Sequence, residues 1–234
     1  MQSVVFLDLK IDKDEALALL DEYGEFIKKH TGIECTWNVE RRDFSVVPTV
    51  PDNDGDLKPT AAYRQLLSKD VHDRYGDYGA DNIIMWVHED NFLYKGVWGT
   101  AWSYVHFKYN FLLCRWDKDN SVNTWNTLFH EGEHPADTLI RKELGIDINP
   151  LIAAHFNEPG FNYDRDYVHG NSPQFEYIGR RGYERDGRML KFLAPYLRKA
   201  YQRRRDKQKL PLLKKAVELL STLLRLRFKK KQVQ

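Results

Sequence analysis

The stretch His130-Glu131-Gly132-Glu133-His134 says most about the fold of this chain, because it matches the pattern H-E-x-x-H. On a helix, this spacing places two imidazoles one turn apart on the same face, where both can reach one zinc ion. The glutamate after the first histidine then lies beside the metal, where its carboxylate can take a proton from a water molecule that attacks a peptide carbonyl. The motif therefore predicts a metal-binding helix with hydrolytic chemistry.

The residues before the motif favour a strand that leads into this helix. Residues 110–116 are mostly apolar, and residues 117–121 form a cluster of turn-favouring residues. Asn123 or Thr124 can cap the helix that follows. Apolar residues recur at helical spacing and should form a stripe that faces the core: Val122, Trp125, Leu128, Phe129, Ala136, Leu139 and Ile140.

Pro135 should disturb the helix close to its second histidine. Proline has no backbone N–H, and its ring would clash with the carbonyl of Glu131. We therefore expect a kink or a break beside His134, with both histidines still within reach of one metal ion. Asp137 falls on the same face, where its carboxylate is expected to hold a histidine instead of binding the metal itself.

The chain before the motif alternates predicted strands and helices. Glycines in the strand at 96–104 suggest that it lies at an edge of the sheet. The order of elements predicts an α+β fold, in which a mixed, twisted sheet precedes the motif helix. Strands are expected at 4–11, 33–47, 82–88, 96–104 and 110–116, helices at 14–30 and 61–75, and a loop at 48–59.

With this order of elements, the chain resembles the zincin metallopeptidases, and among them the small metzincin-like and archaemetzincin-like catalytic domains. The resemblance covers residues 1–145 by order of elements, and His130, Glu131 and His134 by motif. It implies a catalytic domain over 1–177 that uses zinc to hydrolyse a polypeptide or a peptide-containing polymer. The two histidines would be metal ligands, the glutamate would be the general base and later the proton donor, and the edge strand would bind the substrate backbone.

The third zinc ligand does not follow from the metzincin pattern H-E-x-x-H-x-x-G-x-x-H. Asp137 stands in place of its glycine, and Ile140 in place of its last histidine. We favour His169, because an imidazole in a polar loop binds zinc well and Gly170 permits a tight turn. This pair also resembles the histidine and glycine that complete the site of SprT-like proteases. The alternatives, two of which resemble ligands of aspzincins and gluzincins, are Asp164, Asp166, His155 and Glu158.

A tyrosine near the metal often stabilises the oxyanion that forms when water attacks a carbonyl. Several tyrosines follow the motif in the segment expected to complete the site: Tyr163, Tyr167, Tyr177 and Tyr183. We choose Tyr167 as the candidate catalytic residue, with Tyr177 as the alternative.

Positive charge is concentrated at the C-terminal end of the chain. Residues 178–234 contain 19 Lys or Arg and 4 Asp or Glu, although the whole chain has a net charge of only +2. Two amphipathic helices are expected, at 188–205 and 212–228, with a break at Lys209-Leu-Pro211. This basic extension either packs on the catalytic domain or binds an anionic partner. The alternative to a peptidase is therefore a non-catalytic zincin-like structural or binding domain with basic helices that bind such a partner.

Composition limits the remaining possibilities. At 234 residues with 42% hydrophobic content, the chain can bury one good core. The sequence begins with a predicted strand instead of a signal-like segment, and no stretch approaches the length of a membrane span. We therefore expect a soluble protein without a signal peptide or a transmembrane segment, located in the cytoplasm or associated with a phage.

Overall fold

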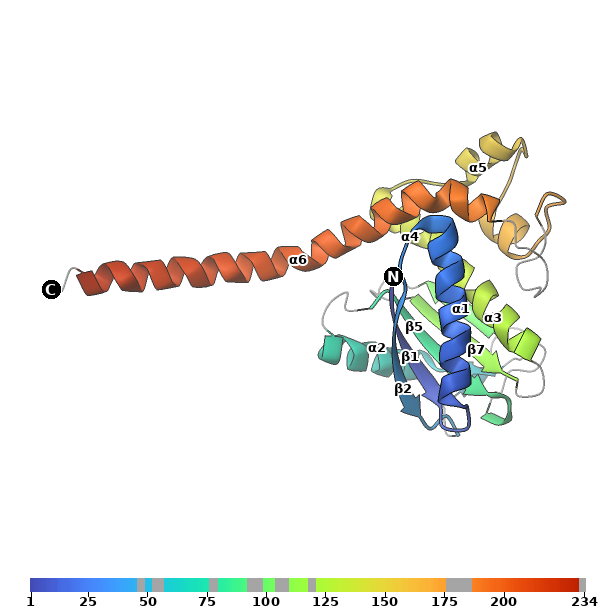
Figure 1. Cartoon of the computed structure of the whole chain (residues 1–234), viewed down its shortest axis with the longest axis horizontal. Helices are drawn as coiled ribbons and strands as arrows, with labels where there is room; N and C mark the ends of the chain where they lie inside the picture. The colour runs from blue at the N-terminus through green and yellow to red at the C-terminus, as the bar shows by residue number, and fades with distance from the viewer. Residues whose placement is uncertain are drawn as a thin grey trace.

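The computed structural model has an α+β fold in which a five-stranded sheet lies between helices (Figure 1). The α+β prediction is confirmed.

No helix in the described part of the chain is long and apolar enough to cross a bilayer. The structure describes residues 1–45, 49–51, 57–75, 80–91, 99–103, 110–117, 121–175 and 187–231.

Four strands of the sheet are parallel, and the fifth is an antiparallel strand at one edge. The strand order is β2-β1-β5-β7-β6, and only β6 runs against its neighbour. The edge position predicted for the glycine-containing strand is therefore confirmed. The strands are β1 (Gln2–Asp8), β2 (Thr36–Arg42), β5 (Asn82–His88), β6 (Gly99–Ser103) and β7 (Asn110–Trp116).

A short hairpin occupies part of the region predicted as a loop. β3 (Thr49–Pro51) pairs antiparallel with β4 (Leu57–Pro59). The loop predicted for 48–59 is therefore wrong for these two stretches. Proline cannot donate a hydrogen bond to a neighbouring strand, so the prolines of this region suggested a loop. They are tolerated at strand ends, and here Pro51 and Pro59 are the last residues of the two strands.

Alternate residues of the central strands face two separate layers of core. Val5 and Ile84 belong to the layer beneath α1 (Lys13–Thr31) and the motif helix. Met85 and its neighbours on that face belong to the layer beneath α2 (Ala61–Tyr75). Both predicted helices are confirmed, and the two layers bury the sheet on both sides. A short 3₁₀ turn, η1 (Glu89–Asn91), follows β5.

The motif helix is interrupted at His134, as the sequence predicts. α3 (Ser121–Glu133) ends one residue before it, and α4 (Pro135–Leu144) begins one residue after it. Pro135 thus occupies the first turn of a new helix, where the missing N–H would have no partner in any case. The break leaves His130 in the last turn of α3 and His134 at the junction.

The first turn of α3 is tied to the end of β7. Because the helix begins at Ser121, the caps predicted at Asn123 or Thr124 are wrong. Thr124 lies inside the helix, and its hydroxyl accepts a hydrogen bond from the backbone N–H of Asp117 at 2.9 Å. This contact links the central strand directly to the helix that carries the motif.

The C-terminal helix, α6 (Arg188–Lys231), is one continuous element of 44 residues, although Pro195 and Pro211 lie within it. The break predicted at 209–211 is therefore wrong. An interior proline removes one hydrogen bond and can bend a helix without ending it.

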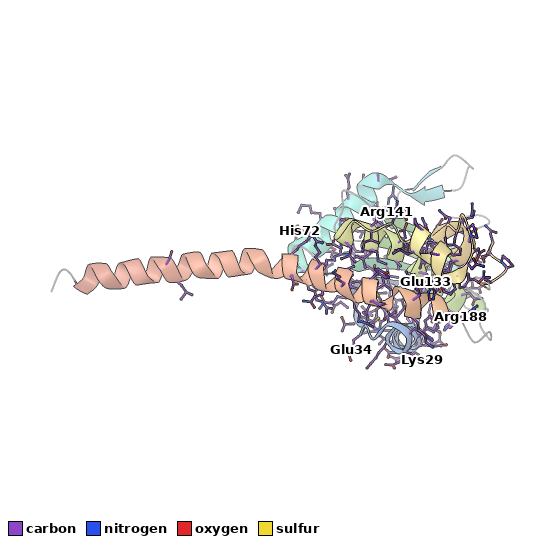
Figure 2. All side chains as sticks on the ribbon, turned by 90° about the horizontal axis from the view of Figure 1, so that it is seen from above. Lys29, Glu34, His72, Glu133, Arg141 and Arg188 are labelled. Atoms are coloured by element: carbon purple, nitrogen blue, oxygen red, sulfur yellow. The ribbon has the colours of Figure 1, made fainter. Side chains whose placement is uncertain are left out.

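The first half of α6 packs on α1 and α4. Its buried contacts include Met189, Leu190, Leu193, Leu197 and Ala200. Residues 208–231 instead extend away from the body, as both views of the chain show (Figures 1 and 2). The domain boundary expected at 177 falls outside the described residues.

Gly132 is needed where α3 packs against α1. A methyl group at this position would overlap the hydroxyl of Tyr23, whose buried ring also packs edge-on against Phe129. We predict that Gly132→Ala lowers the free energy of unfolding by about 1 to 3 kcal/mol, although alanine is the better helix former. Urea unfolding would measure the loss, and adding Tyr23→Phe should recover part of it. A Gly132→Ala protein as stable as the unaltered chain would contradict this close contact.

Candidate metal centre

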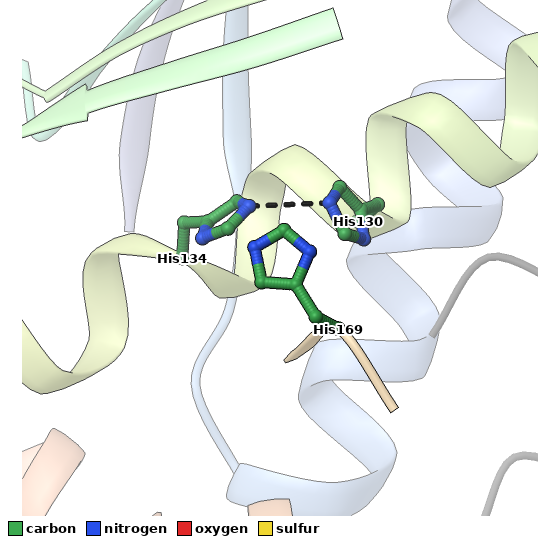
Figure 3. A group of neighbouring side chains, drawn as sticks. All are labelled: His130, His134 and His169. Carbon is green, nitrogen blue, oxygen red and sulfur yellow. Dashed lines mark hydrogen bonds between the residues drawn. The ribbon is translucent and has the colours of Figure 1, made fainter. Parts of the chain in front are cut away.

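His130, His134 and His169 converge on one point (Figure 3). Each offers one ring nitrogen, and these nitrogens all lie within 4.8 Å of one another. The Nε2 atoms of His130 and His134 are 3.2 Å apart. Two nitrogen ligands of a tetrahedral zinc ion are separated by about 3.3 Å, so this spacing fits a cation between them. The three predicted histidines therefore form a group that can bind a metal ion.

A short π-helical turn brings His169 to the motif helix. The turn, η2 (Tyr163–Val168), follows α5 (Asn149–Phe156), and the sequence predicted neither element. Gly170 has a φ of +66°, a left-handed conformation that glycine adopts without strain. The tight turn expected after His169 is thus present.

Tyr163 anchors this turn to the junction between α3 and α4. Its buried hydroxyl donates a hydrogen bond to the backbone carbonyl of Glu133 at 3.1 Å. Its backbone N–H donates to the side-chain oxygen of Asn149 at 2.8 Å. From the sequence, Tyr163 was one of four candidates for the oxyanion, and nothing in its spacing indicated this anchoring role.

Asp164 holds the ring of His134. Its Oδ1 lies 2.6 Å from His134 Nδ1, whereas His134 Nε2 faces His130. A carboxylate at Nδ1 favours the tautomer that carries the proton there and leaves Nε2 free to bind a metal. The hydrogen bond with His134 lowers the pKa of Asp164, so the carboxylate is charged. Asp137, which the sequence favoured for this role, instead binds Arg141 at 3.2 Å.

The other candidates for the third ligand have partners elsewhere. The buried carboxylate of Asp166 binds the guanidinium of the neighbouring arginine at 2.5 Å. Glu158 accepts a hydrogen bond from a serine hydroxyl at 2.8 Å. His155 stacks on Phe192, with ring centroids 4.4 Å apart. Within the described ranges, none of the three belongs to the histidine group.

Glu131 lies buried next to the histidines. Its Oε2 is 4.0 Å from His134 Nε2 and has no hydrogen-bond partner among the described residues. Burial, helped by the negative charge of Asp164, raises the pKa of Glu131 well above its ordinary value. A cation held by the histidines would act in the opposite direction and favour the carboxylate. A buried acceptor oxygen without a partner therefore fits a site that is completed by a metal ion and water.

Tyr167, the candidate for the oxyanion, has an environment typical of packing. Its ring is buried, 5.3 Å from that of Tyr163 and 5.4 Å from that of Phe175 by centroids. These ring contacts lend no support to a role at the metal, and that role stays a prediction. Tyr177 and Tyr183 lie outside the described residues.

Comparison of the chain with protein-family models, curated proteins and solved structures found no match. Its function therefore has to be inferred from the site.

Proposed function

We propose that this chain is a zinc-dependent peptidase of the zincin type. The proposal rests on the convergence of His130, His134 and His169 beside the buried Glu131. Three protein ligands with a fourth position left for water are typical of catalytic zinc sites, whereas structural sites use four. Imidazole ligands also suit zinc better than they suit magnesium or calcium.

Each residue of the site has a distinct task in this mechanism. The three histidines would hold the ion, and Asp164 keeps His134 in the tautomer that presents Nε2. When bound, zinc would polarise the substrate carbonyl and lower the pKa of a coordinated water. Glu131 takes a proton from the attacking water and returns it to the amine that leaves. The side chains of His169 and Asp164 are 46% and 60% exposed, so one side of the site is open to a polymer.

The proposed substrate is an extended polypeptide or a peptide-containing polymer. The edge strand β6 contacts both α3 and α4, the two halves of the motif helix. Within the described sheet, β7 is its only strand neighbour. An extended chain can add to such an edge through main-chain hydrogen bonds, which would bring its peptide groups alongside the histidines.

Hydrolysis of an unstructured protein such as casein tests this function. The zinc-loaded chain should release peptides, a chelator should abolish the release, and added zinc should restore it. If the chain binds zinc through the three histidines but cleaves no polypeptide, it is the non-catalytic zincin-like domain instead.

Asp164→Asn should weaken zinc binding by about 10-fold to 100-fold, the usual effect of losing a carboxylate that orients a metal-binding histidine. Competition with a chromophoric chelator would measure the dissociation constant. Asp137→Asn is the matched control, because its carboxylate lies on α4, close to the motif, but binds Arg141 instead of a histidine. The control should bind zinc almost as the unaltered chain does. If both variants lost the same affinity for zinc, the loss would come from the removal of a negative charge near the site and would not show that Asp164 orients His134.

A further inference from the structure

The outer half of α6, residues 208–231, is here called the projecting segment. The inner half is fixed to the body by ion pairs as well as by apolar contacts. Lys207 binds the buried carboxylate of Glu143 at 2.7 Å, and Arg204 lies 3.4 Å from Asp81. Beyond these contacts the helix leaves the body and continues outward (Figure 2). The fold and the metal centre therefore leave this segment available for another role.

Apolar and polar residues of the projecting segment separate at helical spacing. At 3.6 residues per turn, the nine apolar residues between 212 and 226 fall within one arc of about 180°. The six polar residues of the same stretch fall in the opposite arc, and three of them are Lys214, Lys215 and Arg225. Leu220, in the apolar arc, is 58% exposed. An apolar arc of this width is typical of a helix that packs this face against another surface.

The charge of the projecting segment indicates which surface this is. The segment contains eight Lys or Arg and one acidic residue, Glu218. Three of these basic residues lie in the polar arc, and four more follow the apolar stretch, between Arg227 and Lys231. An apolar arc combined with many basic residues is typical of helices that lie in the plane of an anionic bilayer surface. We propose that the projecting segment binds such a lipid surface, with the apolar arc in the interface and the polar arc toward the headgroups.

Two other partners fit the segment less well. A second copy of the chain would place two strongly positive segments side by side, and a two-stranded coiled coil would cover only a narrow seam of the apolar arc. A nucleic acid would contact the basic positions but leave the apolar arc in water. A bilayer that contains anionic lipids covers the apolar arc and neutralises the charge at the same time.

Flotation of the full zinc-loaded chain with lipid vesicles tests this proposal. Binding to vesicles of phosphatidylserine and phosphatidylcholine should be at least ~10-fold tighter than to phosphatidylcholine alone, and high salt should weaken it. Leu220→Glu should weaken binding at least ~10-fold, because it places a negative charge in the apolar arc. Leu66→Glu is the matched control, since Leu66 is also exposed, at 59%, but lies on α2. This control should bind the vesicles as the unaltered chain does.

Circular dichroism and zinc content should be the same in both variants and in the unaltered chain, so that a loss of vesicle binding cannot reflect a loss of fold. Equal binding to both kinds of vesicle, or full binding by Leu220→Glu, would overturn the proposal. Binding of duplex DNA or RNA without vesicle binding would overturn it in favour of a nucleic acid. A dimer that Leu220→Glu dissociates, without vesicle binding, would show that a second copy covers the segment. The lipid proposal does not depend on peptidase activity, so either can fail alone.

Discussion

Replacing Glu131 by glutamine should reduce the turnover of a peptide substrate by at least ~10²-fold and leave zinc content and fold unchanged. Glutamine has nearly the same size and shape, and Glu131 is not a member of the group that would hold the ion. The substitution removes only the carboxylate that accepts the proton of the attacking water. Turnover at saturating substrate, measured together with the zinc content of the same sample, separates loss of the base from loss of the metal.

Glu158→Gln is the matched control for this experiment. Glu158 follows the motif in the same region of the chain, but its carboxylate accepts a hydrogen bond from Ser172 and takes no part in the histidine group. The control should retain activity. A fully zinc-loaded Glu131→Gln protein that hydrolyses peptides at the original rate would end the general-base mechanism.

Replacing His169 by alanine should reduce the affinity for zinc by more than ~10²-fold. Losing a carboxylate that only orients a metal-binding histidine already lowers the affinity by up to about 10²-fold, and His169 is itself a proposed ligand. Without this imidazole the protein offers only the two ligands of the motif helix. Zinc should therefore dissociate during dialysis, and hydrolysis should fall with it. Metal analysis after dialysis against a weak chelator would measure the remaining occupancy.

His155→Ala is the control for the third ligand. The sequence left His155 open as an alternative, but its ring stacks on Phe192 at 4.4 Å between centroids. Zinc content should therefore be unchanged in this variant. Equal zinc content in His155→Ala and His169→Ala would contradict the assignment of the ligand.

The sequence predicted the motif histidines and the helix break from local geometry, and it predicted His169 from the affinity of zinc for an imidazole in a polar loop before a glycine. Helical spacing brings His130 and His134 together, and the break beside them follows from the missing N–H of proline. Asp164 was misjudged because its contact with His134 depends on how η2 packs against the motif helix. Asp137 has the right spacing on the helix but pairs with Arg141 one turn later. Local periodicity cannot reveal a contact between distant segments.

The difference between local patterns and contacts of distant segments also explains which elements of the fold were predicted. Continuous apolar runs identified β5 and β7, because both strands are buried on both faces of the sheet. The hairpin of β3 and β4 and the continuity of α6 were missed because their prolines suggested interruptions. The turn η2 is held by Tyr163 through bonds to Asn149 and Glu133, which lie far from it in the sequence. Such bonds follow from tertiary packing and leave no periodic pattern.

Anomalous diffraction at the zinc edge, from crystals of the zinc-loaded protein, tests the three-histidine centre most directly. We predict one zinc ion about 2.0 to 2.1 Å from a ring nitrogen of each of His130, His134 and His169, with an open position facing Glu131. The Asp164 carboxylate should remain on His134 Nδ1. An ion bound elsewhere, or one held by the motif histidines without His169, would contradict this centre.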